Sequence, residues 1–131
     1  MDQDMLQRLS LVFFATLAIA LLPRLAVPSS YPSIEVLNRS DHCAWVTFYH
    51  KGLMDINWTM QKNQWWPGFL GPNWHTGFAS TNSWRMKVLV EIMPGIDHCG
   101  GNRIGAIDFV TDVPADRVYL RHTNGRWTLT R

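Results

Sequence analysis

The chain contains 131 residues, including seven Trp, and carries a net charge of +2 from 12 basic and 10 acidic side chains. This length suits one domain, because a single hydrophobic core usually serves about 100 to 150 residues. The nearly balanced charge gives no excess of basic residues for binding a polyanion, which argues against nucleic acid as a partner. The many Trp residues need an explanation, since Trp concentrates in cores, binding faces and membrane interfaces.

The chain begins with a segment, residues 1–26, that is predicted to be a signal peptide or a helical signal anchor. Within it, residues 9–22 are almost entirely apolar. That run has the length of the apolar region of a signal peptide, whereas a helix needs about 20 residues to span a bilayer. A retained anchor is the alternative, because Asp2 and Asp4 stand where a signal peptide usually has basic residues. In both cases we expect an extracytoplasmic protein, either secreted or anchored to a membrane.

Residues 27–33 are rich in Pro and Ser and are predicted to be a linker, so that the folded domain spans residues 34–131. In this domain, segments of alternating apolar and polar residues recur between turn-forming residues, and no long stretch has helical spacing. The segment 43–50 is apolar on both faces, which is typical of a central strand buried from two sides. We predict strands at 34–38, 43–50, 53–59, 84–92, 104–110, 118–123 and 126–131.

Seven or eight short strands in about 100 residues predict an all-β fold, a small antiparallel β-sandwich. A small closed barrel is the alternative. The last two strands flank Asn124-Gly125, the dipeptide that best supplies the two positive φ angles of a type I′ hairpin. A two-residue turn then places Thr123 opposite Arg126 and His122 opposite Trp127, with His122 and Trp127 on the apolar face.

The two cysteines, Cys43 and Cys99, are predicted to form a disulfide that pins the two sheets together, because an even cysteine count in an oxidising compartment usually indicates a bridge. Each cysteine follows an Asp-His pair, so a site with two Cys and two His ligands for zinc is the alternative. Adjacent side chains on a strand point to opposite faces, which argues against that site. If the disulfide forms, His42 and His98 are expected near each other, as a weak candidate for a metal or pH-sensing pair.

The segment Trp65–Phe78 contains five aromatic residues, two Pro and three Gly. Such a loop either folds back on the core or presents its rings to a ligand. The alternative to a binding loop is a long connection packed across the end of the sandwich. The candidate binding residues are Trp65, Trp66, Phe69, Trp74, His75 and Phe78, together with Arg121 and Arg126 on the polar face of the hairpin.

The sequence contains no motif of a known hydrolase, zinc protease or phosphate-binding loop, so we do not expect an enzyme or a cofactor. Asn38 and Asn57 lie in sequons that would accept N-glycans in a eukaryotic host, with Asn38 the more plausible of the two. The leading hypothesis is an exported module that binds a glycan, a lipid surface or a protein through the Trp-rich loop. A structural surface domain without a dedicated ligand is the rival hypothesis, and a metal-dependent enzyme is a third.

Overall fold

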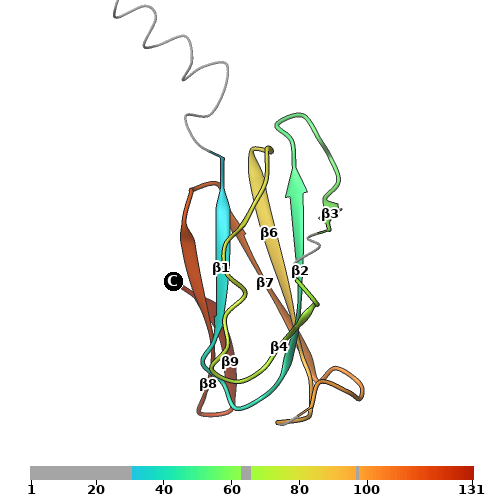
Figure 1. The fold of residues 1–131 in the computed structure, drawn as a ribbon, viewed down its shortest axis with the longest axis vertical. Coiled ribbons are helices and arrows are strands. Elements are labelled where there is room, and N and C mark those ends of the chain that lie inside the picture. Colours follow the sequence, from blue (N-terminus) through green and yellow to red (C-terminus); the bar gives the residue numbers. More distant parts are fainter. Residues whose placement is uncertain (1–30, 63–65, 97) are drawn as a thin grey trace, which may run out of the picture. The chain divides into compact units, whose positions relative to one another are not determined.

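Two β-sheets form the computed structural model, which describes residues 31–62, 66–96 and 98–131 (Figure 1). The first sheet has the strand order β5-β1-β8-β9, and the second has the order β3-β2-β6-β7, with β4 also paired to β2. The first sheet consists of β1 (Ser33–Asn38), β5 (Ala79–Ser80), β8 (Asp116–Thr123) and β9 (Arg126–Thr130). The second consists of β2 (Ala44–Lys51), β3 (Thr59–Gln61), β4 (Phe69–Leu70), β6 (Arg85–Ile92) and β7 (Gly105–Thr111).

The described part of the chain is therefore all-β with two sheets, as predicted, and the alternative of one closed barrel does not apply. The predicted signal segment, residues 1–26, lies outside the described residues, as do residues 27–30 of the predicted linker. The end of that linker belongs to the fold, since Pro32 is fully buried and Ser33 begins β1. Among the residues described, no helix has the length and the apolar character needed to cross a membrane.

The core lies between the two sheets and is built from alternating residues of each strand. In β6, Met86, Val88, Val90 and Ile92 are buried, as the alternation in the sequence predicts. The other large side chains of the core are Ile34, Val36, Val46, Phe48, Leu70, Val118, Leu120 and Leu129. Burial of one face of each sheet is the main stabilising contribution to a fold of this size.

The prediction that the segment 43–50 is buried on both faces is wrong. In β2, Val46 and Phe48 point into the core, whereas Trp45 is partly exposed on the other face. The reason is that no third layer covers this sheet in the described part of the chain. The apolar residues on the outer face of β2 are therefore available to pack against the loop that follows β3.

The prediction of a strand at 53–59 is also wrong, except for its last residue, Thr59, which begins β3. Here the chain turns: Asp55 accepts a hydrogen bond from the backbone of Gly52 and donates its own N–H to the carbonyl of Gly52. This side-chain bond offers the backbone an alternative to a strand. Met54 and Ile56 are left 89% and 88% exposed at the turn.

The prediction of purely antiparallel sheets is wrong. Strands β1 and β8 pair in parallel, from Ile34 opposite Asp116 to Asn38 opposite Leu120. After β1 the chain forms β2, β3 and β4 of the second sheet, returns to the first sheet for the short strand β5, and forms β6 and β7 before β8 runs beside β1 in the same direction. Such a pairing joins strands that are distant in the sequence, so no local turn signal could indicate it.

The C-terminal hairpin is confirmed in full. Thr123 lies opposite Arg126 and His122 opposite Trp127, and both turn residues, Asn124 and Gly125, have positive φ angles, of 54° and 75°. The predicted disulfide between Cys43 and Cys99 is also present, with a Cα–Cα distance of 5.2 Å. It does not pin the two sheets together, however, because Cys43 directly precedes β2 and Cys99 lies in the loop between β6 and β7, which are strands of the same sheet.

Candidate functional site

The described part of the Trp-rich loop, residues 66–78, is fixed to both sheets by hydrogen bonds. Its strand β4 pairs with the start of β2, and Val46 of β2 donates its N–H to the carbonyl of Gly68. Further along, the loop runs beside β1, where Thr76 donates its N–H to the carbonyl of Val36. The loop thus crosses from one sheet to the other, as Figure 1 shows for the segment that contains β4. The three Gly and two Pro of the segment do not prevent these contacts.

Asn38, at the end of β1, is the residue that holds this loop in place. Its side chain is fully buried and donates hydrogen bonds to the carbonyls of His42 and Leu70, at 2.8 and 3.0 Å. Its amide oxygen accepts from the backbone and the hydroxyl of Ser40. Its backbone N–H is bonded to the carbonyl of Trp74. Asn38 therefore connects β1, the turn before β2 and the Trp-rich loop, a role that the sequence analysis missed.

This burial bears on the two sequons. The amide of Asn38 uses both N–H groups inside the protein, so the folded domain has no room for a glycan there. Asn57 lies in the exposed turn before β3 and is accessible.

The aromatic residues of the loop divide into two groups. Trp66 packs against the core and donates its indole N–H to the carbonyl of Val46 at 3.0 Å. Phe69, Trp74 and Phe78 remain exposed, Trp74 by 57%. The loop is therefore neither wholly packed nor wholly presented to solvent, because Trp66 packs on the core while the aromatic residues that follow it in the loop are exposed. Trp65 lies outside the described residues.

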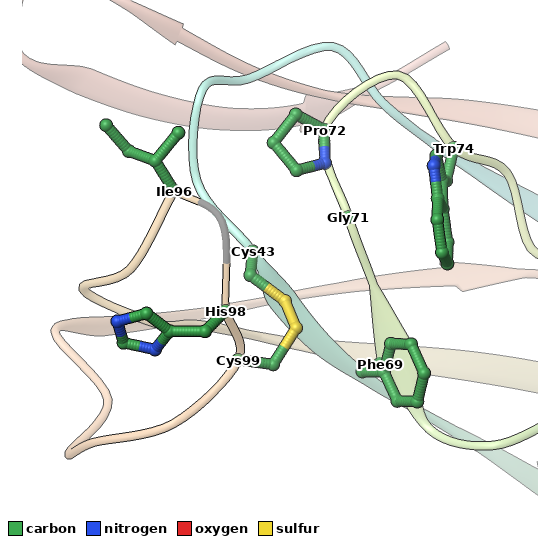
Figure 2. A pocket seen from close by; sticks show the side chains of 8 residues that line it. All are labelled: Cys43, Phe69, Gly71, Pro72, Trp74, Ile96, His98 and Cys99. Atoms are coloured by element: carbon green, nitrogen blue, oxygen red, sulfur yellow. A yellow bond between two sulfur atoms is a disulfide. The ribbon is translucent and has the colours of Figure 1, made fainter.

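A pocket of about 380 Å³ opens beside the disulfide (Figure 2). Its aromatic walls are Phe69 and Trp74, and its size is at the lower end of the range for small-ligand sites. The pocket is mostly apolar, and His98 supplies an imidazole at its edge. The lining residues are Cys43, Phe69, Gly71, Pro72, Trp74, Ile96, His98 and Cys99.

The aromatic walls of the pocket, Phe69 and Trp74, are held in position by contacts with neighbouring residues. The ring of Phe69 lies between Trp45 and Trp74, with centroid distances of 6.1 and 6.2 Å. Trp45 donates its indole N–H to the carbonyl of Cys99 at 2.9 Å. Trp74 lies over Gly71, at a distance where a methyl group on that glycine would just be in contact with the indole. We refer to Trp45, Phe69 and Trp74 as the aromatic row.

Of the other predicted binding residues, those that the structure describes do not line this pocket. His75 lies 3.1 Å from a carboxylate oxygen of the buried Glu35, whose other oxygen accepts a hydrogen bond from Arg117. Arg117 also stacks on the ring of Phe78. These residues join β1 to β8 in a structural ion network, which the sequence analysis did not anticipate.

Arg121 and Arg126 lie on the C-terminal hairpin, and both are exposed. The guanidinium group of Arg121 stacks on Tyr119, 4.7 Å from the ring centroid. Neither arginine is among the residues that line the pocket.

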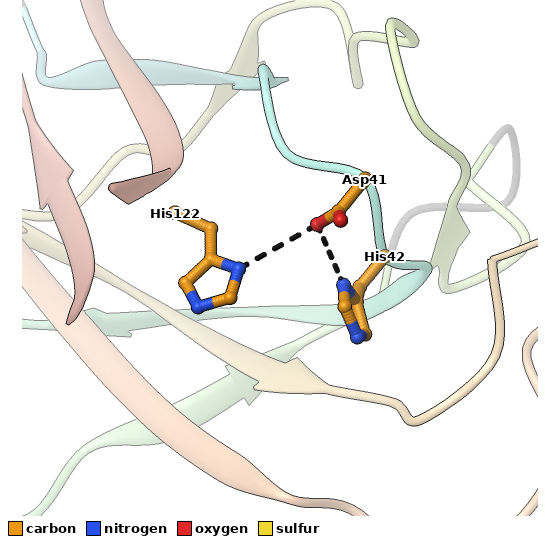
Figure 3. Close-up of side chains that lie close together, drawn as sticks. All are labelled: Asp41, His42 and His122. Atoms are coloured by element: carbon orange, nitrogen blue, oxygen red, sulfur yellow. Dashed lines mark hydrogen bonds and ion pairs between the residues drawn. The ribbon is translucent and has the colours of Figure 1, made fainter. Parts of the chain in front are cut away.

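A second cluster lies where the turn before β2 meets the end of β8 (Figure 3). Nδ1 of His42 is 2.7 Å from a carboxylate oxygen of Asp41, and Nδ1 of His122 is 3.6 Å from the same oxygen. The hydrogen bond with His42 is the main reason why the pKa of Asp41 is lowered from its ordinary value. The ring of Trp127 stacks on His122, with centroids 4.1 Å apart and planes within 2°.

The structure gives the two predicted metal-pair residues different neighbours. His42 belongs to the cluster with Asp41 and His122, while His98 lines the aromatic pocket. The duplicated Asp-His-Cys pattern suggested the pairing of His42 with His98. The hairpin register was the better signal, because it placed His122 and Trp127 on the inward face at the end of the sandwich.

The fold and its surface define a class: a small, disulfide-linked, two-sheet β domain that carries an aromatic pocket. The disulfide is consistent with an oxidising, extracytoplasmic compartment. No known protein family matches the chain, and neither a curated protein nor a solved structure matches it. The function has therefore to be argued from the residues of the chain itself.

Proposed function

We propose that this domain is an exported carbohydrate-binding module that stacks a sugar ring on the aromatic row, chiefly on Trp74. The observation that supports this most directly is the placement of Trp74, which is 57% exposed, packs over Gly71 on one side and forms a wall of the pocket. The indole of Trp74 therefore presents a large apolar surface to water, and its contact with Gly71 restricts its orientation.

Exposure of the apolar indole surface of Trp74 to water costs free energy that burial would recover. A large aromatic side chain buries roughly 150 to 250 Å² when it is covered, and burial stabilises by about 25 cal/mol per Å². Trp66, in the same loop, shows that the chain can turn an indole inward. The exposure of Trp74 therefore favours a ligand-binding surface over the rival hypothesis of a structural domain.

The shape and chemistry of the pocket favour a sugar ring among the three ligand classes. A pyranose has one face of C–H groups, which suits a flat aromatic surface, and hydroxyl groups that prefer to stay hydrated. A pocket of about 380 Å³ accommodates one such ring. Among the described lining residues, His98 supplies an imidazole that can bond a hydroxyl group, while hydroxyl groups outside the pocket remain in contact with water.

The aromatic row is also preorganised. The hydrogen bond from Trp45 to Cys99 and the ring contacts of Phe69 fix the surface before a ligand arrives. Ordering a side chain on binding costs about 0.5 to 1.5 kcal/mol, so prior fixation favours affinity. The disulfide contributes by holding Cys99, and with it the loop that bears His98, against the start of β2.

Export is part of the proposal. The apolar run at 9–22 supports a signal peptide or an anchor, and the disulfide supports an oxidising compartment. A secreted form and a membrane-anchored form would both present the pocket outside the cytoplasm.

The test is to screen the full chain against a panel of oligosaccharides and to measure the affinity of any ligand found by calorimetry. We expect Trp74→Ala to weaken binding at least about tenfold, since stacking on one aromatic ring contributes more than about 1.4 kcal/mol in such sites. Phe78→Ala is the matched control, because Phe78 belongs to the same loop, is also exposed, by 39%, and is not among the residues that line the pocket.

Three outcomes would contradict the proposal. One is a panel in which no carbohydrate binds, and another is a ligand whose affinity is the same for Trp74→Ala as for the wild type. The third is a large loss of stability in Trp74→Ala, which would assign the ring to the core. Binding of an apolar peptide in place of sugars would instead support a protein partner.

A further inference from the structure

We propose that Asp41, His42 and His122 form a binding site for one late first-row divalent metal ion, such as Zn²⁺ or Cu²⁺. The site is separate from the aromatic pocket, with which it shares no lining residue. The inference is independent of the carbohydrate proposal.

The ligand atoms already lie close to one another. One ligand atom from each residue can be chosen so that all three fall within 4.8 Å of one another. In a tetrahedral zinc site with bonds of about 2.0 to 2.2 Å, neighbouring ligand atoms lie about 3.4 Å apart. The distances of 2.7 and 3.6 Å from the Asp41 oxygen to the two imidazole nitrogens bracket this value. Side-chain rotations that move the ligand atoms by roughly 1 Å would bring these distances to the tetrahedral value.

The donor set indicates which ions the site takes. Two imidazoles and one carboxylate suit zinc, copper and nickel, whereas magnesium and calcium require oxygen ligands. Three protein ligands leave a fourth position open, as in catalytic zinc sites. Asp41 is exposed, so that position faces solvent.

The surroundings of the cluster fix the ligands. Trp127 stacks on His122 and meets the ring of His42 edge to face at a centroid distance of 5.2 Å, so one indole orients both imidazoles. The backbone of His42 is held by Ser40, and its carbonyl accepts a hydrogen bond from Asn38. Groups that orient metal ligands in this way raise affinity, and their loss commonly weakens binding about 10- to 100-fold.

The topology explains how these residues meet. Asp41 and His42 lie in the turn that leads from the first sheet to β2, while His122 lies near the end of β8. The parallel pairing of β1 with β8 brings the end of β1 next to Leu120, and hence the turn after β1 next to His122. The backbone N–H of Arg39 bonded to the carbonyl of Leu120 fixes this approach.

The experiment is a calorimetric titration of the full chain with Zn²⁺ alone. We expect one ion per chain, and an affinity that falls at least about tenfold in each of Asp41→Asn, His42→Gln and His122→Gln. His50→Gln is the matched control, because His50 lies at the other end of β2, hydrogen-bonded to Ser83, and its loss should leave the affinity unchanged. Circular dichroism shows whether each variant is folded, and His122→Gln changes a side chain outside the core.

A second readout tests the geometry. Bound Cu²⁺ should quench the fluorescence of Trp127, because the indole stacks directly on a ligand. Trp127→Phe should remove that quenching while the chain still binds the ion. The proposal is overturned if Zn²⁺ does not bind, if it binds equally well to the three variants, or if the quenching persists in Trp127→Phe. Carbohydrate binding by the His122→Gln variant should be normal, so failure of one proposal is distinguishable from failure of the other.

Discussion

Replacement of Asn38, the fully buried last residue of β1, by Ala should be strongly destabilising, although the sequence shows this residue only as part of a sequon at a strand end. Four hydrogen bonds of its side chain are lost, two as donor and two as acceptor. Each buried bond contributes about 1 kcal/mol net. In the variant the Ser40 hydroxyl can donate its one proton to the His42 carbonyl instead of to Asn38, so we expect a loss of about 3 kcal/mol. For a domain of about 100 residues this corresponds to a decrease in Tm of roughly 15 °C.

The assay is urea denaturation of Asn38→Ala and of the wild type, both produced without glycosylation, with the free energy of unfolding taken from the linear extrapolation. Asn57→Ala is the matched control, because it removes the other sequon from an exposed turn and should change stability by no more than about 0.5 kcal/mol. Equal stability of the two variants would refute the role of Asn38 as the residue that joins β1 to the Trp-rich loop.

Three further predictions concern the supports of the loop and the pocket. Trp66→Ala should destabilise the domain by about 3 kcal/mol in the same denaturation assay, since Trp66 packs on the core; a change below about 1 kcal/mol would contradict this packing. Replacement of both Cys43 and Cys99 by Ser removes the disulfide and should lower the free energy of unfolding by about 4 kcal/mol, because the bridge closes a loop with a sequence separation of 56 residues. A variant that unfolds at the same urea concentration as the wild type would contradict this value. Gly68→Ala should lower Tm, because Gly68 has a φ of 102° and an added Cβ would lie 2.8 Å from the indole of Trp45. Gly71→Ala should be tolerated, because the nearest atom to its added Cβ would lie 3.5 Å away. Equal melting curves for the two variants would contradict this difference.

Features that depend on neighbouring residues were predictable from the sequence. The alternation in β6 predicted which of its side chains are buried, and Asn124-Gly125 predicted the hairpin register residue by residue. Both are local, because a strand has a period of two and a two-residue turn fixes the pairing. The disulfide was predictable from the cysteine count and the expected compartment.

Apart from the disulfide, the features that depend on contacts between distant segments were not predictable. The parallel pairing of β1 with β8 joins the two ends of the domain, and it places Asp41 beside His122. Nothing in the composition of the Trp-rich loop separates Trp66, which packs inward, from Trp74, which remains exposed. Their positions follow from the pairing of β4 with β2, a contact that becomes apparent only in three dimensions.

The strand predicted at 53–59 failed for a local reason. The side chain of Asp55 closes a turn with Gly52, and such a hydrogen bond competes with strand formation. Leu53, Met54 and Ile56 are apolar, yet all three are exposed. A polar residue that can bond its own backbone was therefore the more reliable signal in this segment.

The most direct test of the proposed function is to record the indole N–H signals by NMR while an oligosaccharide identified in the screen is added. We predict that the signal of Trp74, assigned by its absence in Trp74→Ala, shifts with increasing ligand, while the signal of Trp66, whose N–H is bonded to Val46, stays in place. A titration in which the Trp74 signal remains constant while binding saturates would contradict the account.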